Sequence, residues 1–360
     1  MRTPPRPVAL AWAAVVALTL LASWGFDLLG LPSPQLFGAL FAGMVYAVSG
    51  RGPDVQLPRW GSVAGQALIG ISMGALLNLA TLRALGGHAG PIALVNIATL
   101  ALSLLLGQAF ARAGRIGQAT GTFAMIAGGA SGITAIAREL GADDRITSVV
   151  QYLRVVMILV GMPLVTAAVF RPTADAAPAS SLDESSLATS LLFTLVSAVV
   201  GVWLARLVRF PSGALLGPLF VAAGISLTGW IGHPGVPDAV VAVGYALVGL
   251  QVGLRFTRAS LRQVGRLLPL AVVFVLLVVV GCAGLGMALS AVTGMPQLDC
   301  YLATTPGGLY AVLATAASSG ADVTFVLAVQ VIRLILVLAS APLIASWFRG
   351  HPGAWDDEVD

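Results

Sequence analysis

Two arginines within apolar segments are the residues of this chain best suited to chemistry. Each follows a glutamine by three positions, in Gln151-x-x-Arg154 and Gln330-x-x-Arg333. On a helix this spacing places both side chains on one face. A guanidinium beside a carboxamide suits a carboxylate or phosphate, and an arginine within a membrane normally faces the bundle interior. The pattern predicts an anion site, or arginines that bind loose backbone carbonyls; the two roles are compatible.

Paired glycines with small polar neighbours form a second constellation. Exposed amides at the ends of half-helices bind anions, and unwound carbonyls bind cations. Close helix packing through small residues is the alternative, and it suits the glycine ladders at 65, 70, 74 and 244, 249, 253 better. We therefore expect the double glycines and their neighbours to line a substrate site: Gly128, Gly129, Ser131, Thr304, Thr305, Gly307, Gly308 and Tyr310.

Two aspartates follow Gly-Ala directly before the segments that hold the arginines. Asp143 and Asp322 are expected to cap helices there, although a role in an ion or proton pathway stays open. No carboxylate lies clearly in mid-helix, and the three histidines have no metal-ligand spacing. Cys282 and Cys300 show no pairing pattern. We expect no catalytic residues, no metal and no cofactor, and hence no enzyme.

The composition decides which solvent surrounds these residues. The chain is 58% hydrophobic and only 9% charged, whereas soluble domains carry about 25% charged residues. Such a chain cannot cover a water-exposed surface, so its main partner is the lipid bilayer. The net charge of +4 comes from arginines that lie mostly between apolar runs, where orientation signals belong, and nucleic acid is not expected as a partner.

The chain repeats itself at a constant offset of 179 residues. Pro32-Ser33 matches Pro211-Ser212, Gly141-Ala-Asp143 matches Gly320-Ala-Asp322, and the arginine motifs match as well. A duplicated hydrophobic chain is typical of transporter-like architectures. The repeats are expected to span 1–170 and 187–349, with an extracytoplasmic linker at 171–186 and an acidic cytoplasmic tail at 350–360.

Each repeat contains six apolar elements. The fifth of each holds the paired glycines with serine, threonine or proline, which do not make a stable lipid-facing helix. Irregular backbone at membrane depth is tolerated only inside protein or along a cavity. The twelve expected elements are 8–30, 35–50, 60–78, 90–111, 119–138, 147–170, 187–208, 213–229, 238–254, 267–292, 299–318 and 323–347.

The arginines favour one topology for these elements. If the fifth element of each repeat returns to its own side, fifteen arginines face the cytoplasm and only Arg83 and Arg171 face outward. If all elements cross, the bias vanishes. We therefore predict an all-α integral membrane protein with two inverted repeats of five crossings each. Each repeat adds one broken or re-entrant Gly-Gly helix, and both termini are cytoplasmic.

The duplicated unit resembles a known family. Its Pro-Ser-x-x-Leu-x-Gly-x-Leu, Gly-Gly, Gly-Ala-Asp and Gln-x-x-Arg motifs are similar to those of the bacterial AbrB-type membrane proteins, often labelled ammonia monooxygenase or its regulator. The resemblance covers nearly the whole chain. It implies a bacterial inner-membrane protein with a role in regulating gene expression. More distantly, the layout is similar to 2-hydroxycarboxylate, glutamate and cation–proton-antiporter or anion transporters, which is an analogy of fold.

These observations favour a secondary transporter of a small, anionic solute that works by alternating access. The solute would bind between the Gly-Gly segments, with Arg154 or Arg333 holding its negative group. The alternative is a membrane-embedded sensor or regulator on a transporter-like fold. Association into homo-oligomers is compatible with either function.

Overall fold

All secondary-structure elements in the described part of the computed structural model are helices. That part comprises residues 6–28, 33–50, 53, 55–77, 79–126, 142–170, 187–208, 213–228, 235–256, 258 and 265–349. The expected linker at 171–186 and tail at 350–360 lie outside it. The helices fall into two compact units, and each unit takes helices from both sequence repeats.

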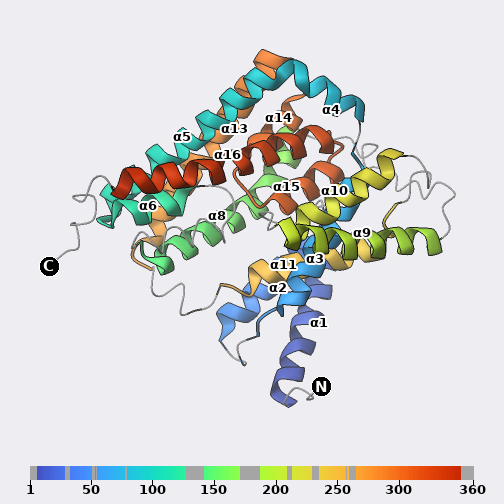
Figure 1. Cartoon of the computed structure of the whole chain (residues 1–360). Coiled ribbons are helices and arrows are strands. Elements are labelled where there is room, and N and C mark those ends of the chain that lie inside the picture. The colour runs from blue at the N-terminus through green and yellow to red at the C-terminus, as the bar shows by residue number, and fades with distance from the viewer. Residues whose placement is uncertain are drawn as a thin grey trace. The chain divides into compact units, whose positions relative to one another are not determined.

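Unit 1 is formed by the first three helices of each repeat. Helix α2 packs on α1 and α11, while α3 packs on α10 and α9 (Figure 1). The bounds are α1 Arg6–Leu28, α2 Pro34–Ser49, α3 Arg59–Ala75, α9 Leu187–Val208, α10 Gly213–Thr228 and α11 Asp238–Gly253.

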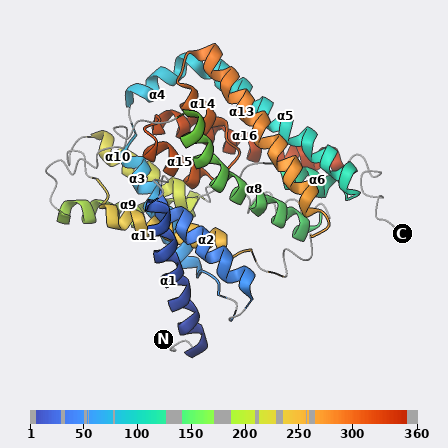
Figure 2. The ribbon, with the colours of Figure 1, turned by 180° about the vertical axis from the view of Figure 1, so that it is seen from behind.

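Unit 2 is formed by the later helices of each repeat, and α8 and α15 run on into unit 1. Helices α5 and α13 lie side by side in both views (Figure 1 and Figure 2). The short helix α4 (Leu79–Leu85) and a 3₁₀ turn (Gly86–His88) precede α5, and a π-helical turn (Thr166–Phe170) follows α8. The remaining bounds are α5 Ala89–Gly114, α6 Gln118–Met125, α8 Asp144–Val165, α13 Leu268–Thr293, α14 Gln297–Thr304, α15 Leu309–Ser318 and α16 Val323–Arg349.

The helix bounds recur at the same offset of 179 residues as the sequence motifs. Three pairs begin and end at matching positions, namely α2 with α10, α5 with α13, and α6 with α14. The matching ends have matching geometry, because Arg115 after α5 and Gly294 after α13 both adopt the left-handed conformation, with φ of 50° and 72°. These three helices therefore recur at matching positions in the two repeats.

Unit 1 is held together by reciprocal contacts between the repeats. A Cβ added to Gly70 would overlap the carbonyl oxygen of Leu215, and one added to Gly249 would overlap that of Leu36. Gly249 and Leu215 are the repeat mates of Gly70 and Leu36, so the same contact occurs twice with the roles exchanged. Such an exchange is the signature of a twofold relation. The glycine ladders thus serve close helix packing, as the alternative from the sequence predicted.

The described helices suit a lipid environment. By length and composition, five of them can cross a membrane: Val8–Leu28, Gly86–Gly114, Ile146–Phe170, Leu187–Val208 and Leu268–Thr293. Helices α1 and α9 also expose large apolar side chains, among them the repeat mates Trp24 (66% exposed) and Trp203 (61% exposed). Exposed apolar surface of this extent marks contact with lipid or another apolar partner. The chain is therefore an all-helical protein with membrane-like helices.

Candidate functional site

The fifth element of the second repeat is broken at the paired glycines. Helix α14 ends at Thr304, and α15 begins at Leu309. Between them the amide of Gly307 donates to the carbonyl of Thr305 over 2.9 Å, which turns the chain out of the helix. Pro306 lies in the same segment and cannot donate to a helical carbonyl. The predicted helix break is present, and whether the segment returns to the side it entered from stays a prediction.

The first repeat has an equivalent half-helix end at the matching position. Helix α6 ends at Met125, where the amide of Ile126 still donates to the carbonyl of Thr122 over 3.2 Å. In the second repeat the amide of Thr305 donates to the carbonyl of Tyr301 over 3.1 Å, at the matching position. Residues 127–141, which include the predicted site residues Gly128, Gly129 and Ser131, lie outside the described part.

Glycines on the long helices let the half-helices approach closely. A Cβ added to Gly107 of α5 would lie 2.7 Å from the Cα of Thr122, and one added to Gly286 of α13 would lie 2.8 Å from the carbonyl oxygen of Cys300. Distances under about 3 Å are below van der Waals contact, so neither position accepts a larger residue without a shift. Gly107 and Gly286 are repeat mates. They fix α6 against α5 and α14 against α13.

Arg333 caps the C-terminal end of half-helix α14 by hydrogen bonds to its last carbonyl groups. It projects from α16, is only 6% exposed, and its Nη1 donates to the carbonyl oxygens of Thr305 at 2.8 Å and Thr304 at 3.4 Å. The last carbonyls of a helix have no partner within the helix, and leaving one buried and unpaired costs about 1–3 kcal/mol. The arginine supplies that partner and places a positive charge at the negative end of the helix dipole.

Arg154 makes the equivalent contacts in the first repeat. Its Nη1 donates to the carbonyl oxygens of Ile126 at 2.9 Å and Met125 at 3.2 Å. Ile126 and Met125 are the repeat mates of Thr305 and Thr304. The side chain is 5% exposed. Of the two roles predicted for the arginines, binding of loose backbone carbonyls is therefore seen in both repeats.

The glutamines assist the arginines. Gln151 Nε2 donates to the carbonyl oxygen of Phe123 at 2.9 Å, and Gln330 Nε2 donates to those of Leu302 at 3.0 Å and Thr305 at 3.1 Å. Arg333 Nη2 donates in turn to Gln330 Oε1. The i, i+3 spacing thus places each pair on one face, as predicted, and both side chains reach the same half-helix end.

These contacts leave the positive charge and one N–H donor of each arginine uncompensated. All of the acceptors are neutral, and neither guanidinium has a carboxylate partner among the described residues. The Nε atoms of Arg154 and Arg333 are buried and have no hydrogen-bond partner within the described part of the chain. The charge of Arg333 also acts on Arg154, so the two cations are near enough to repel each other. Burying a charge costs several kcal/mol, which neutral partners offset only in part. The arrangement favours an anion nearby.

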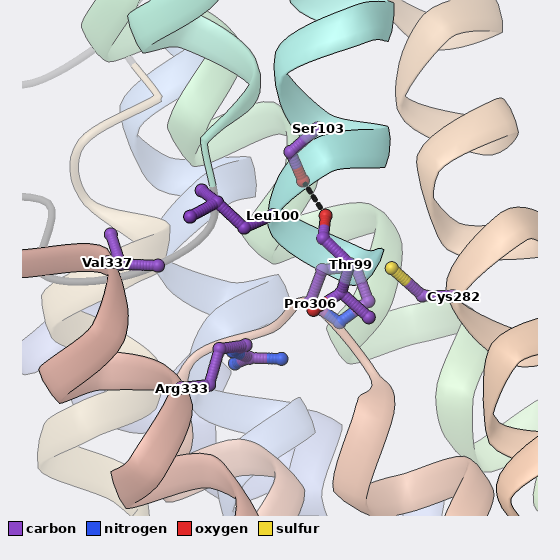
Figure 3. Close-up of a pocket in the computed structure, with 7 residues that line it drawn as sticks. All are labelled: Thr99, Leu100, Ser103, Cys282, Pro306, Arg333 and Val337. Atoms are coloured by element: carbon purple, nitrogen blue, oxygen red, sulfur yellow. Dashed lines mark hydrogen bonds between the residues drawn. The ribbon is translucent and has the colours of Figure 1, made fainter. Parts of the chain in front are cut away.

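A small cavity lies beside Arg333 (Figure 3). The guanidinium extends from α16 toward Pro306 of the helix break and Thr99 of α5, and the sulfur of Cys282 approaches from α13. The free volume is about 10 Å³, close to the ~10–15 Å³ that one water molecule requires. The described residues that line it are Thr99, Leu100, Ser103, Cys282, Pro306, Arg333 and Val337.

Several residues of this region were not predicted as site residues. Thr99, Ser103 and Cys282 line the cavity. Ser103 and Cys282 are repeat mates, and that shared position within long apolar helices was the one available signal. Asp299 is a carboxylate that is only 5% exposed, in the first turn of α14. It occupies the position that Thr120 has in the first repeat.

The remaining predicted residues lie at the starts of helices α8, α15 and α16. Asp143 caps α8, because its Oδ1 accepts a hydrogen bond from the amide of Ile146 at 3.3 Å, and its own amide donates to Thr120 Oγ1 at 3.0 Å. Asp322 has the corresponding position before α16. Tyr310 lies in the first turn of α15. Cys282 and Cys300 are free and buried.

Comparison with known proteins places the chain in a family. The family model described as "Transition state regulatory protein AbrB" matches residues 36–349. A protein of Escherichia coli K12 named "Putative regulator AbrB" is 31% identical over 342 residues, which is 95% of this chain and 97% of that protein. The "Uncharacterized protein YhjN" of Bacillus subtilis 168 is 28% identical over 79% of this chain and 77% of its own length. The match covers both repeats and both arginine motifs, and the chain belongs to the AbrB family.

Proposed function

We propose that this protein is a secondary transporter of a small anionic solute in the bacterial inner membrane. In this proposal ten segments cross the membrane as two inverted repeats, one broken Gly-Gly helix per repeat re-enters, and both termini are cytoplasmic. The protein is then a carrier rather than an enzyme. It needs no cofactor, binds no nucleic acid, and is able to work within a homo-oligomer.

One observation carries the proposal. Arg154 and Arg333 are two buried cations without a carboxylate partner in the described part of the chain. Each binds carbonyl oxygens at the C-terminal end of a half-helix in its own repeat. A structural role alone would be met by neutral donors, such as the glutamine amides that already bind Phe123 and Leu302. A permanent charge adds attraction for an anion, and ionisable groups inside a membrane usually mark the path of a solute.

The half-helix ends give the anion a second source of attraction. Arg333 Nη1 binds carbonyls at the C-terminal, negative end of α14, and only four residues separate this end from the start of α15, which is the positive end of its dipole. Gly307 and Gly308 put no side chain in front of the first amides of α15. Opposed half-helix ends of this kind bind substrate in several transporter folds.

The reciprocal contacts support the inverted arrangement. The pair Gly70 and Leu215 and the pair Gly249 and Leu36 relate the repeats by a twofold operation. If that axis lies in the membrane plane, the repeats are inverted. The arginine distribution along the sequence favours the same arrangement. Four shorter apolar helices, Pro34–Ser49, Gly213–Thr228, Asp238–Gly253 and Val323–Val337, supplement the five long ones and supply further crossings.

Uptake into proteoliposomes tests the proposal. The purified full chain is reconstituted, and uptake of radiolabelled formate, acetate, phosphate and sulfate is measured for the wild type, Arg154→Gln and Arg333→Gln. We expect uptake of at least one anion by the wild type and a loss of tenfold or more in both variants. Arg112→Gln, an exposed arginine near the end of α5, is the control. Unchanged uptake in both site variants would remove the arginines from the mechanism.

A membrane-embedded regulator is the second candidate. It is favoured by the descriptions of the family and of the Escherichia coli relative, and by the small size of the cavity beside Arg333. A regulator would bind its ligand without net flux. The same proteoliposomes distinguish the two functions, because saturable binding that is not followed by accumulation inside the vesicles supports the regulator and contradicts the transporter.

A further inference from the structure

The cavity beside Arg333 is built from both repeats and from the helix break. Cys282 and Ser103, which are repeat mates, face it from α13 and α5, and Pro306 closes it from the segment between α14 and α15 (Figure 3). Cys282 is fully buried and Arg333 is 6% exposed. The described lining residues belong to unit 2, so they place the cavity within one compact body.

The strongest free donor at this cavity is the Nε–H of Arg333. Nη1 donates to Thr305 and Nη2 donates to Gln330, whereas Nε is buried and has no acceptor among the residues that the structure describes. Ser103 Oγ donates to the carbonyl of Thr99 at 2.9 Å, and Thr99 Oγ1 donates to that of Asn96 at 2.9 Å, but neither hydroxyl oxygen accepts a hydrogen bond from Nε in the described part of the chain. A bound acceptor atom would satisfy this group.

The charge at the cavity is positive. Both guanidinium groups act electrostatically on Cys282, so a negative charge beside its sulfur would be attracted by Arg154 and Arg333 together. Among the described residues, no carboxylate lines the cavity. A neutral ligand would use the free donor but would leave the two buried charges uncompensated. An anion meets both requirements.

The free volume limits which anions fit. About 10 Å³ accepts roughly one water-sized group. A halide, or one oxygen of a small carboxylate that extends toward the helix break, needs room of this order. A tetrahedral oxyanion such as phosphate or sulfate carries four oxygens around a central atom and does not fit without displacement of a lining side chain.

We propose that this cavity binds one monovalent anion no larger than formate, with Arg333 Nε as its donor and with Cys282 and Ser103 as the walls that limit its size. The inference rests on the proposed function, because it names the class of solute that the site would accept. It goes further by assigning selectivity to a pair of repeat mates outside the Gln-x-x-Arg and Gly-Gly motifs.

The first test is thermal unfolding of the purified full chain in detergent. Sodium gluconate is replaced by formate, chloride, acetate, phosphate or sulfate at constant ionic strength. A ligand that binds only the folded state raises the melting temperature, and we expect a rise of about 2–5 °C with formate and chloride. Phosphate and sulfate stabilise proteins by exclusion from their surface. Their effect is therefore expected to be equal in the wild type and Arg333→Gln, whereas that of formate is lost in the variant.

The second test enlarges the cavity. Cys282→Ala removes the sulfur atom and leaves space for about one more heavy atom, which is the difference between formate and acetate. We expect acetate to stabilise Cys282→Ala as strongly as formate stabilises the wild type. Cys300→Ala is the matched control, because Cys300 is also buried and free but does not line the cavity. This comparison decides the question even if Arg333→Gln fails to fold.

The inference is overturned if formate and chloride do not raise the melting temperature beyond its value in gluconate. It is also overturned if phosphate stabilises as strongly as formate through Arg333, or if Cys282→Ala and Cys300→Ala respond alike to acetate.

Failure of this inference is separable from failure of the proposed function. Anion uptake that is insensitive to Cys282→Ala would refute only the cavity as the selective site. Formate binding without uptake would refute only transport.

Discussion

Arg333 Nη1 lies 2.8 Å from the carbonyl oxygen of Thr305 and joins the middle of one helix to the broken end of another. Its repeat mate Arg154 makes the same contact with Ile126 at 2.9 Å. A guanidinium has five donors in a rigid plane, so it holds the carbonyls and still presents an Nε–H elsewhere. This division of donors explains how one residue can be structural and also available to a ligand.

Replacement of Arg333 by lysine tests the structural role of the guanidinium. Lysine keeps the positive charge, but its compact ammonium cannot reproduce the planar set of donors. We expect Arg333→Lys to lower the free energy of unfolding by about 2–4 kcal/mol, measured by thermal unfolding in detergent, and Arg154→Lys to have a similar effect. Arg112→Lys, at an exposed position, should change stability by less than about 0.5 kcal/mol. Stability equal to that of the wild type in Arg333→Lys would show that the carbonyl contacts are dispensable.

The reciprocal packing of unit 1 predicts equal sensitivity at two glycines. A Cβ at Gly70 or Gly249 would overlap a carbonyl oxygen of the facing helix, so we expect Gly70→Ala and Gly249→Ala each to destabilise by about 1–3 kcal/mol. Gly224 of α10 is the matched control, because nothing lies within 4 Å of a Cβ added there. Gly224→Ala should be neutral or stabilising by up to about 1 kcal/mol. Melting temperatures of the three variants check the prediction, and a loss confined to one of the paired glycines would contradict the twofold relation.

The inverted topology predicts that repeat mates face opposite sides of the membrane. Ala113 near the end of α5 and Val292 near the end of α13 are mates, and both are exposed. We expect a membrane-impermeant maleimide added to intact cells with a permeable outer membrane to label Val292→Cys, and to label Ala113→Cys only after the inner membrane is opened. The native Cys282 and Cys300 are buried, so the wild type serves as the unlabelled control. Equal labelling of both positions from outside would rule out inverted repeats with one re-entrant segment each.

The cap at the start of α8 predicts different effects of two changes at Asp143. Its carboxylate accepts the amide hydrogen of Ile146, a role that asparagine can also fill. We expect Asp143→Ala to cost about 1 kcal/mol of stability and Asp143→Asn to cost little. Uptake, where it is found, should be retained in Asp143→Asn. A loss of uptake with normal stability in that variant would instead assign Asp143 to an ion or proton pathway.

The sequence by itself determined what depends on local order. The offset of 179 residues predicted matching helices, and the bounds of α2 and α10 or of α5 and α13 recur at that offset. The spacing of Gln330 and Arg333 set a shared helical face, because that relation needs only 3.6 residues per turn. The Gly-Gly pair after Pro306 predicted a break, because glycine and proline weaken a helix wherever they lie in its interior.

The tertiary structure alone decided which groups these residues meet. Arg333 reaches Thr305 across 28 positions of the chain, and Ser103 comes to the same cavity as its mate Cys282. Such contacts depend on how closely helices approach, and that distance is set by small residues such as Gly107 and Gly286 on the facing helix. The grouping of helices from both repeats into each compact unit also depends on how closely helices approach. Periodicity fixes the faces of a single helix, and only packing selects which faces meet.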